Sequence, residues 1–82
     1  MIKHIIDPDG SERWYRKNRI HNNNGAAVLL FDGDEYWYRN GKKHRKEGPA
    51  LVYFDGFEVW AKNGKEQRAN GPFQVSPDGI EV

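Results

Sequence analysis

The sequence repeats itself every 23 residues without an insertion or deletion, and no other feature constrains its fold as strongly. An Asp-Gly pair, a glutamate, a tryptophan and a further glycine each recur at this interval. The recurring positions are Asp9, Asp32, Asp55 and Asp78; Glu12, Glu35, Glu58 and Glu81; Trp14, Trp37 and Trp60; and Gly25, Gly48 and Gly71. A fixed period of this length indicates a repeat architecture, in which each residue can be compared with its counterparts in the other units.

The period divides the chain into three full units and a shortened fourth, at 4–26, 27–49, 50–72 and 73–82. A length of 82 residues predicts a single domain that spans residues 1–82. Such a small domain buries a limited share of its surface. Its core is therefore expected to depend on large side chains, namely three Trp, four Tyr and four Phe.

Each unit contains two runs of β-forming residues that end at turn signals. In the second unit, the run 27–31 ends at Asp32-Gly33 and the run 35–39 ends at Asn40-Gly41. Both dipeptides tolerate the positive φ angles of a two-residue type I′ hairpin turn, which is the turn predicted for each. Residues 17–19 replace the Asn-Gly pair in the first unit.

Helices are disfavoured because Gly or Pro interrupts the sequence every few residues. The predicted fold class is all-β: a meander of tandem antiparallel β-hairpins, with about six or seven strands, that forms one elongated twisted sheet. Side-chain alternation places Trp, Phe31, Phe54, Ala27 and Ala50 on the predicted inner face. The opposite face is also apolar in the middle units, so either twist covers both faces or this face binds a partner.

Residues 37–50 match the pattern Trp-Tyr-x-Asn-Gly-Lys-x-His-Arg-x-x-Gly-Pro-Ala throughout. With this motif and the Asp-Gly pairs, the chain resembles MORN-type repeat proteins, and most closely a variant repeat of small bacterial and phage proteins. The resemblance implies tandem 23-residue hairpins and a non-enzymatic binding or scaffold role. It also implies a phage factor that binds and modulates a host protein.

The residues that could support catalysis or metal binding are few. The chain has no cysteine, and no carboxylate cluster accompanies His4, His21 or His44. Metal ligands must converge on one point, whereas His21 and His44 are one unit apart. We expect both to hydrogen-bond backbone near a loop, as Gln67 can in the third unit. The sequence therefore predicts no metal site, no cofactor and no enzymatic activity.

Charge is segregated within the units, although the whole chain carries 13 basic and 12 acidic residues. Acids gather at the Asp-Gly turn and bases at the second turn. If the units stack in register, one long edge of the sheet is acidic and the opposite edge is basic. The basic loop is densest in the second unit, where tyrosines flank it. The predicted contact residues are Tyr36, Tyr38, Arg39, Lys42, Lys43, Arg45 and Lys46.

This stripe of basic and aromatic side chains suits an acidic protein surface, and protein binding is the preferred function. One alternative is binding of RNA or another single-stranded nucleic acid, with bases stacked on the aromatic rings. A second is a structural or homo-oligomeric role, since the edge segments 2–6 and 80–82 could pair in a homodimer. Solvated, unpartnered hairpin loops would give the same charge pattern.

The location expected for the chain is cytoplasmic, without membrane association. No apolar run approaches the length of a membrane span. Residues 1–4 lack the basic flank and apolar stretch of a signal peptide. The absence of cysteine fits a reducing compartment.

Overall fold

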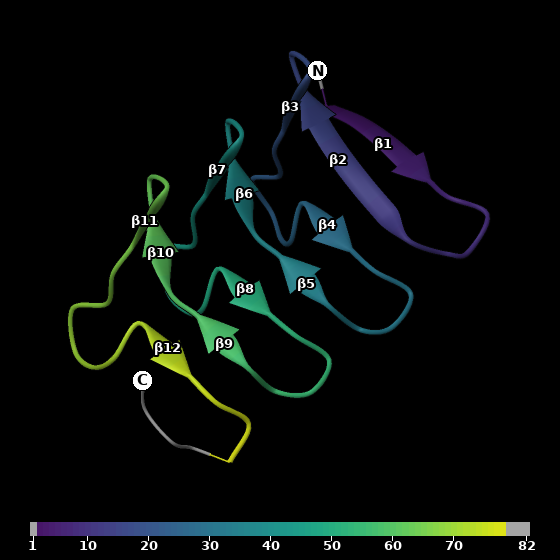
Figure 1. Ribbon diagram of the computed structural model, residues 1–82. Coiled ribbons are helices and arrows are strands. Elements are labelled where there is room, and N and C mark those ends of the chain that lie inside the picture. Colours follow the sequence, from purple (N-terminus) through teal and green to yellow (C-terminus); the bar gives the residue numbers. More distant parts are fainter. Residues whose placement is uncertain (1, 79–82) are drawn as a thin grey trace.

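The chain forms a thin array of antiparallel strands in which successive units step along one axis (Figure 1). This computed structural model describes residues 2–78. The array measures 36 × 26 × 15 Å along its principal axes. The described residues form strands and turns and no helix, so the prediction of an all-β meander of hairpins is confirmed.

Twelve strands are present among residues 2–78, more than the six or seven expected. They are β1 (Ile2–Ile6), β2 (Glu12–Arg16), β3 (Arg19–Ile20), β4 (Val28–Leu29), β5 (Glu35–Tyr36), β6 (Tyr38–Arg39), β7 (Lys42–Lys43), β8 (Leu51–Val52), β9 (Glu58–Val59), β10 (Ala61–Lys62), β11 (Lys65–Glu66) and β12 (Gln74–Val75). The excess arises because each full unit contributes a third short strand and because its second strand is interrupted in two of the units.

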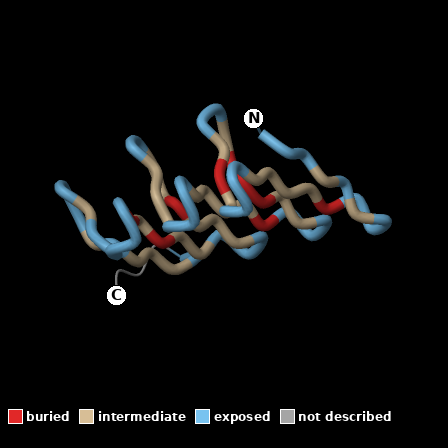
Figure 2. Tube along the Cα trace, turned by 90° about the horizontal axis from the view of Figure 1, so that it is seen from above, coloured by how far each residue is buried: buried red, intermediate tan, exposed pale blue. Residues whose placement is uncertain are grey.

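The main sheet has the order β1-β2-β4-β5-β8-β9-β12, with β3 paired to β2. All of these pairs are antiparallel. The pairs β6-β7 and β10-β11 form separate short hairpins. These two hairpins and the β2-β3 turn, which we call the tips, lie along one side of the array (Figure 1). Figure 2 shows exposed loops that rise on one side of the sheet, with buried residues near their base.

Each tryptophan marks the point where the second strand of a unit changes its partner. The Trp37 N–H donates to the Ala50 carbonyl of the next unit at 2.6 Å, whereas the Trp37 carbonyl accepts from the His44 N–H of its own unit at 3.0 Å. Trp14 and Trp60 make the same pair of bonds in their units. In the second and third units the strand therefore belongs to the main sheet before the tryptophan and to a tip after it. In the first unit β2 also stays paired with β1 along its whole length.

Successive tips are joined to one another by backbone and side-chain hydrogen bonds. The Gly41 N–H donates to the Ile20 carbonyl, and the Gly64 N–H donates to the Lys43 carbonyl in the equivalent place. The imidazole Nδ1 of His21 accepts from the Asn40 N–H at 2.9 Å. Each tip is thereby fixed to the tip of the preceding unit.

The two kinds of turn differ in geometry. Lys17 and Asn18 both have positive φ, as do Asn40 and Gly41, so these turns have the backbone that type I′ requires. In the Asp-Gly turns, glycine has positive φ but aspartate does not. The Gly33 N–H donates to the Leu30 carbonyl, as in a type I turn followed by a glycine bulge. The type I′ prediction is therefore wrong for the Asp-Gly pairs.

The alanines that begin the units are buried as predicted, but the phenylalanines are not. Ala27 and Ala50 are fully buried, and each accepts the hydrogen bond from a tryptophan N–H. Phe31 and Phe54 are 73% and 70% exposed. Their assignment to the inner face is wrong because both lie in the Asp-Gly loops, beyond the paired residues of the strands.

The most continuous apolar row lies on the face that was expected to be secondary. Val28 pairs with Tyr36, Tyr36 with Leu51, and Leu51 with Val59, so these side chains cross the sheet as direct neighbours. Val28 and Val59 are buried, and Tyr36 and Leu51 are half-buried. Cross-strand pairs of this kind stabilise a sheet.

Candidate binding surface

An open pocket of about 570 Å³ lies between the second unit and the loop that precedes it. Trp37 lines it, together with Tyr38 and Arg39 of strand β6. The complete lining is Asn22, Asn23, Trp37, Tyr38, Arg39, His44, Arg45, Lys46 and Glu47. We call this hollow the first pocket.

A second pocket of about 280 Å³ occupies the equivalent place one unit further along. Its lining is Arg45, Lys46, Trp60, Ala61, Lys62, Gln67, Arg68, Ala69 and Asn70. Each of these residues stands 23 positions after a residue of the first pocket. The pocket is therefore a consequence of how adjacent units meet, and its size varies with the side chains that border it.

An arginine covers the tryptophan in both pockets. The Arg45 Cζ lies 3.9 Å from the centroid of the Trp37 ring. The Arg68 Cζ lies at the same distance from the centroid of the Trp60 ring. Arg45 also donates to the Pro49 carbonyl at 3.2 Å. A Cβ added at Gly48, where φ is +132°, would lie 2.8 Å from the Arg45 Cζ, so glycine leaves the room that the guanidinium needs.

The first unit protects its tryptophan differently. Asn22 stands where the later units have arginine, and it donates to the Ala26 carbonyl at 3.0 Å. Its side chain is short, and His4 of strand β1 covers Trp14 instead. The two rings are stacked, with their centroids 4.3 Å apart and an angle of 5° between their planes. The His4 Nε2 in turn lies 2.8 Å from a Glu12 carboxylate oxygen. The additional strand β1 thus substitutes for the missing arginine.

The seven predicted contact residues do not form one cluster. Four of them line the first pocket: Tyr38, Arg39, Arg45 and Lys46. Lys46 is exposed and lines the second pocket as well. The remaining three are Tyr36, Lys42 and Lys43, and none of these lines either pocket.

The three residues outside the pockets have contacts of their own. The Tyr36 hydroxyl donates to the Asp34 carboxylate at 2.7 Å. Burial is the main cause that raises the pKa of Tyr36, and this hydrogen bond is the next largest. Lys43 Nζ lies 3.5 Å from a Glu66 carboxylate oxygen. The side chain of Lys42 passes next to Gly64, where an added Cβ would meet its Cβ at 3.6 Å.

The structure adds residues that the sequence did not single out. Trp37 and Trp60, which were expected to be structural, also line the two pockets. Lys62 and Arg68 repeat the positions of Arg39 and Arg45. The 23-residue spacing could have identified both, because a site made by the junction of units must recur at each junction.

The histidines connect units rather than gather at a site. His21 is 1% exposed; its Nδ1 accepts the Asn40 N–H and its Nε2 bonds to Asn23. His44 Nδ1 accepts the Asn63 N–H at 3.0 Å. Burial, with the charges of Arg39 and Lys62, lowers the pKa of His44. The predicted backbone hydrogen bonds of both histidines are confirmed.

Charge is distributed as the turn positions predicted. The Asp-Gly loops lie along one side of the array and the tips along the other (Figure 1). Between residues 2 and 78, no group of three or more His, Asp or Glu side chains is placed to hold a metal ion. No helix in that part of the chain is long and apolar enough to cross a membrane.

Comparisons with known proteins give no relative: no family model, no curated protein and no solved structure matches this chain.

Proposed function

We propose that the chain is a non-enzymatic protein-binding module and that the row of two pockets binds an acidic segment of a partner protein. The observation that supports this most directly is the recurrence of the pocket lining at 23 residues. Two equivalent hollows beside one another suit an extended chain that presents similar groups at regular intervals. Most of the side chains that border them are cationic, amide or aromatic groups, which favour binding over nucleophilic chemistry.

The charge of the pockets supports an acidic partner. Arg39 and Lys46 are exposed at the first pocket, and Lys62 is exposed at the second. Neither Arg39 nor Lys46 takes part in a hydrogen bond or ion pair that would satisfy its charge within the described chain. Such groups can steer an anionic partner and fix its register.

A protein partner is preferred to a nucleic acid because the tryptophan faces in the pockets are covered. Nucleic-acid binding of this kind needs exposed aromatic faces on which bases stack, and Arg45 and Arg68 already cover Trp37 and Trp60. MORN-like identity and action as a phage factor on a host protein belong to the same proposal and rest on the sequence motifs. A cytoplasmic location also belongs to it and rests on composition, since the chain has no cysteine.

The test is affinity capture from the cell of origin, with and without nuclease, using the native chain and the double variant Arg39→Glu/Lys46→Glu. We expect one defined protein to be retained after nuclease treatment and lost with the double variant. The control variant Lys17→Glu/Lys65→Glu changes net charge equally at tip residues that line neither pocket. It should retain the partner.

Three outcomes would contradict the proposal. Capture that disappears with nuclease would indicate nucleic-acid binding instead. Equal loss in both double variants would mean that net charge, and not the pockets, controls binding. Retention by the Arg39→Glu/Lys46→Glu variant would place the binding surface elsewhere.

A further inference from the structure

The two most exposed large apolar side chains of the described chain belong to neighbouring Asp-Gly loops on the edge opposite the tips. Phe31 and Phe54 are 73% and 70% exposed and occupy equivalent positions in the Asp-Gly loops. Their loops follow strands β4 and β8, which are separated in the sheet only by β5. With neighbouring strands about 4.8 Å apart, the two phenylalanines are spaced by about 10 Å.

The fold itself does not require an aromatic residue at this position. Pro8 and Pro77 occupy the same place in the first and last units. It is the second residue of a type I turn, where proline is favoured because its φ is already suitable. Phenylalanine gives the turn no such advantage and exposes apolar surface to water, so its presence in the two central units calls for another explanation.

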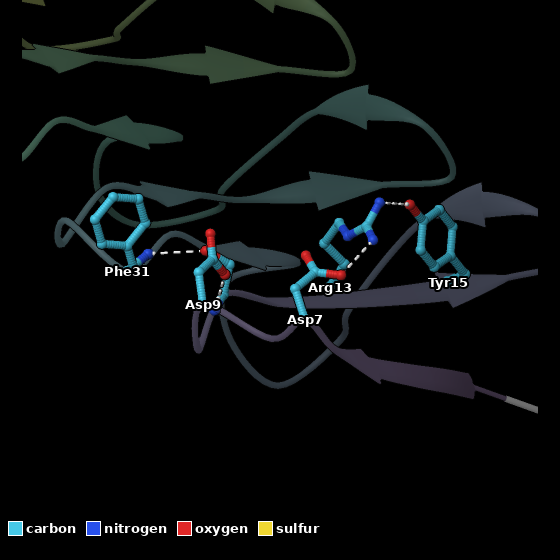
Figure 3. A network of polar contacts seen from close by, with 6 residues as sticks. Asp7, Asp9, Arg13, Tyr15 and Phe31 are labelled. Atoms are coloured by element: carbon cyan, nitrogen blue, oxygen red, sulfur yellow. Dashed lines mark hydrogen bonds and ion pairs between the residues drawn. The ribbon is translucent and has the colours of Figure 1, made fainter.

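The backbone at both phenylalanines is held in place, which directs the rings outward. The Phe31 N–H donates to the Ser11 hydroxyl at 3.0 Å, and the Phe54 N–H donates to the Asp34 carboxylate at 2.7 Å. Figure 3 shows the Phe31 ring pointing away from the polar network that its backbone joins. Two rings on a fixed backbone form a preorganised surface.

Acidic groups surround the two rings. The loops 7–11, 30–34 and 53–57 contain five aspartates and no basic residue. Asp9, Asp32 and Asp55 are exposed. Each of these carboxylates accepts a hydrogen bond from the backbone N–H two residues later. In Asp9, the hydrogen bond from the Ser11 N–H is the main cause that lowers the pKa of the carboxyl. The loops that carry the phenylalanines therefore present carboxylates at the surface.

This chemistry excludes several occupants. Nucleic acids and anionic membranes carry the same charge as the loops. A second copy packed through the same edge would set aspartates against aspartates. The tips of a second copy have complementary charge, but Arg45 and Arg68 already cover the Trp37 and Trp60 rings in the pockets beside them, so these faces are not open to the phenylalanines.

We infer that the loops carrying Phe31 and Phe54 form a second docking surface, which binds a basic amphipathic helix of another protein. Residues seven positions apart on a helix face the same side and are about 10.5 Å apart, which matches the spacing of the rings. Lysines on the flanks of such a helix would pair with Asp32 and Asp55. This surface is independent of the pockets, so it can fail while the proposed function stands.

The probe is a synthetic lysine-alanine helix of roughly 18 residues with two leucines seven positions apart. Titrated into the full-length, isotopically labelled protein, it should shift the amide NMR resonances of 30–34 and 53–57. The variant Phe31→Ser/Phe54→Ser should weaken binding at least about tenfold, because buried aromatic anchors dominate such interfaces. Ile6→Ser removes another exposed apolar side chain, 66% exposed, and should leave binding unchanged.

A second pair of variants tests the charge without removing the rings. In Asp32→Asn/Asp55→Asn, the side-chain oxygen that accepts the N–H is kept and the charge is lost, so binding should weaken and become less sensitive to salt. The proposal is overturned if the probe shifts no resonances in the two loops, or if the serine variant binds as well as the native chain. A peptide with serine in place of both leucines that binds equally well would also overturn it, since charge alone would then suffice.

Discussion

The backbone N–H of Phe54 donates a 2.7 Å hydrogen bond to the Asp34 carboxylate across the boundary between two units. Ser11 makes the equivalent bond with the Phe31 N–H. At the last boundary the acceptor position holds Phe57 and the donor position holds Pro77, which has no N–H. The backbone donor and the side-chain acceptor are thus present together at the first two boundaries and absent together at the last. This hydrogen bond explains why Ser11 and Asp34 follow the Asp-Gly turns of the first two units.

Loss of the Asp34 side chain should destabilise the protein substantially. Asp34→Ala leaves the Phe54 N–H and the Tyr36 hydroxyl without their acceptor, and Asp34 is buried. Removing hydrogen bonds to a charged, buried group costs roughly 2–3 kcal/mol. Asp34→Ser introduces the residue that the first unit has at the equivalent position, Ser11. In urea titrations this variant should have a higher free energy of unfolding than Asp34→Ala. Equal stability of the two variants would show that the bond to Phe54 contributes little.

Acid should weaken the junction at His44. The folded protein lowers the pKa of His44, whereas the unfolded chain takes up the proton near the ordinary value of 6.5. The stability contributed by the neutral ring is therefore complete above that value and is lost as the pH falls through the lower pKa of the folded state. Urea unfolding at about pH 7.5 and about pH 5.5 measures this loss.

The matched variant for this pH effect is His44→Gln, because Gln67 stands at the equivalent position. Its stability should change less between the two pH values than that of the native chain. A native chain and a glutamine variant with the same pH dependence would exclude His44 as the titrating group.

The arginine over Trp37 has two functions that can be separated. Arg45→Ala removes both the ring contact and the hydrogen bond to the Pro49 carbonyl, and should cost about 1–2 kcal/mol. Arg45→Asn should lie between this variant and the native chain, because Asn22 makes the equivalent carbonyl bond without covering a tryptophan. Thermal unfolding ranks the three, and tryptophan fluorescence should shift to longer wavelength in both variants.

The first tip can be stabilised by introducing the turn of the other units. Lys17 and Asn18 adopt positive φ angles of 50° and 63°, which cost energy for a residue with a Cβ. Lys17→Asn/Asn18→Gly introduces the Asn-Gly pair, and should raise the free energy of unfolding by about 1 kcal/mol. The reverse exchange, Asn40→Lys/Gly41→Asn, should lower it. No difference in either direction would mean that the turns do not limit stability.

The fold followed from the sequence where a local signal repeated. Turn dipeptides and β-forming runs located the hairpins and placed acidic and basic turns on opposite edges. The type of the Asp-Gly turn was missed because Asp-Gly is compatible with several turns, and the choice is made by the hydrogen bond from Gly33 to Leu30. The third strand of each full unit (β3, β7 and β11) and the interruption of the second strand at Trp37 and Trp60 were missed. The change of partner that produces them is a property of the array and not of the local sequence.

The candidate surface was harder to predict for the same reason. Tyr38, Arg39, Arg45 and Lys46 were named from local charge and aromatic content and do meet at one pocket. Their neighbours Asn22 and Asn23 come from the preceding unit. Tyr36 stands two residues from Tyr38 in the same apparent stripe, but it lies within the sheet and bonds to Asp34. Local sequence cannot distinguish these two environments.

The change of partner at each tryptophan has a consequence for how the chain comes apart. Because every second strand is shared between two units, no unit is a closed folding element, and an isolated one would have half of that strand unpaired. An array built in this way should unfold from its outer units inward, as nearest-neighbour coupling predicts. Hydrogen exchange should therefore release the Trp60 amide before that of Trp37, whose partners lie at the centre of the array.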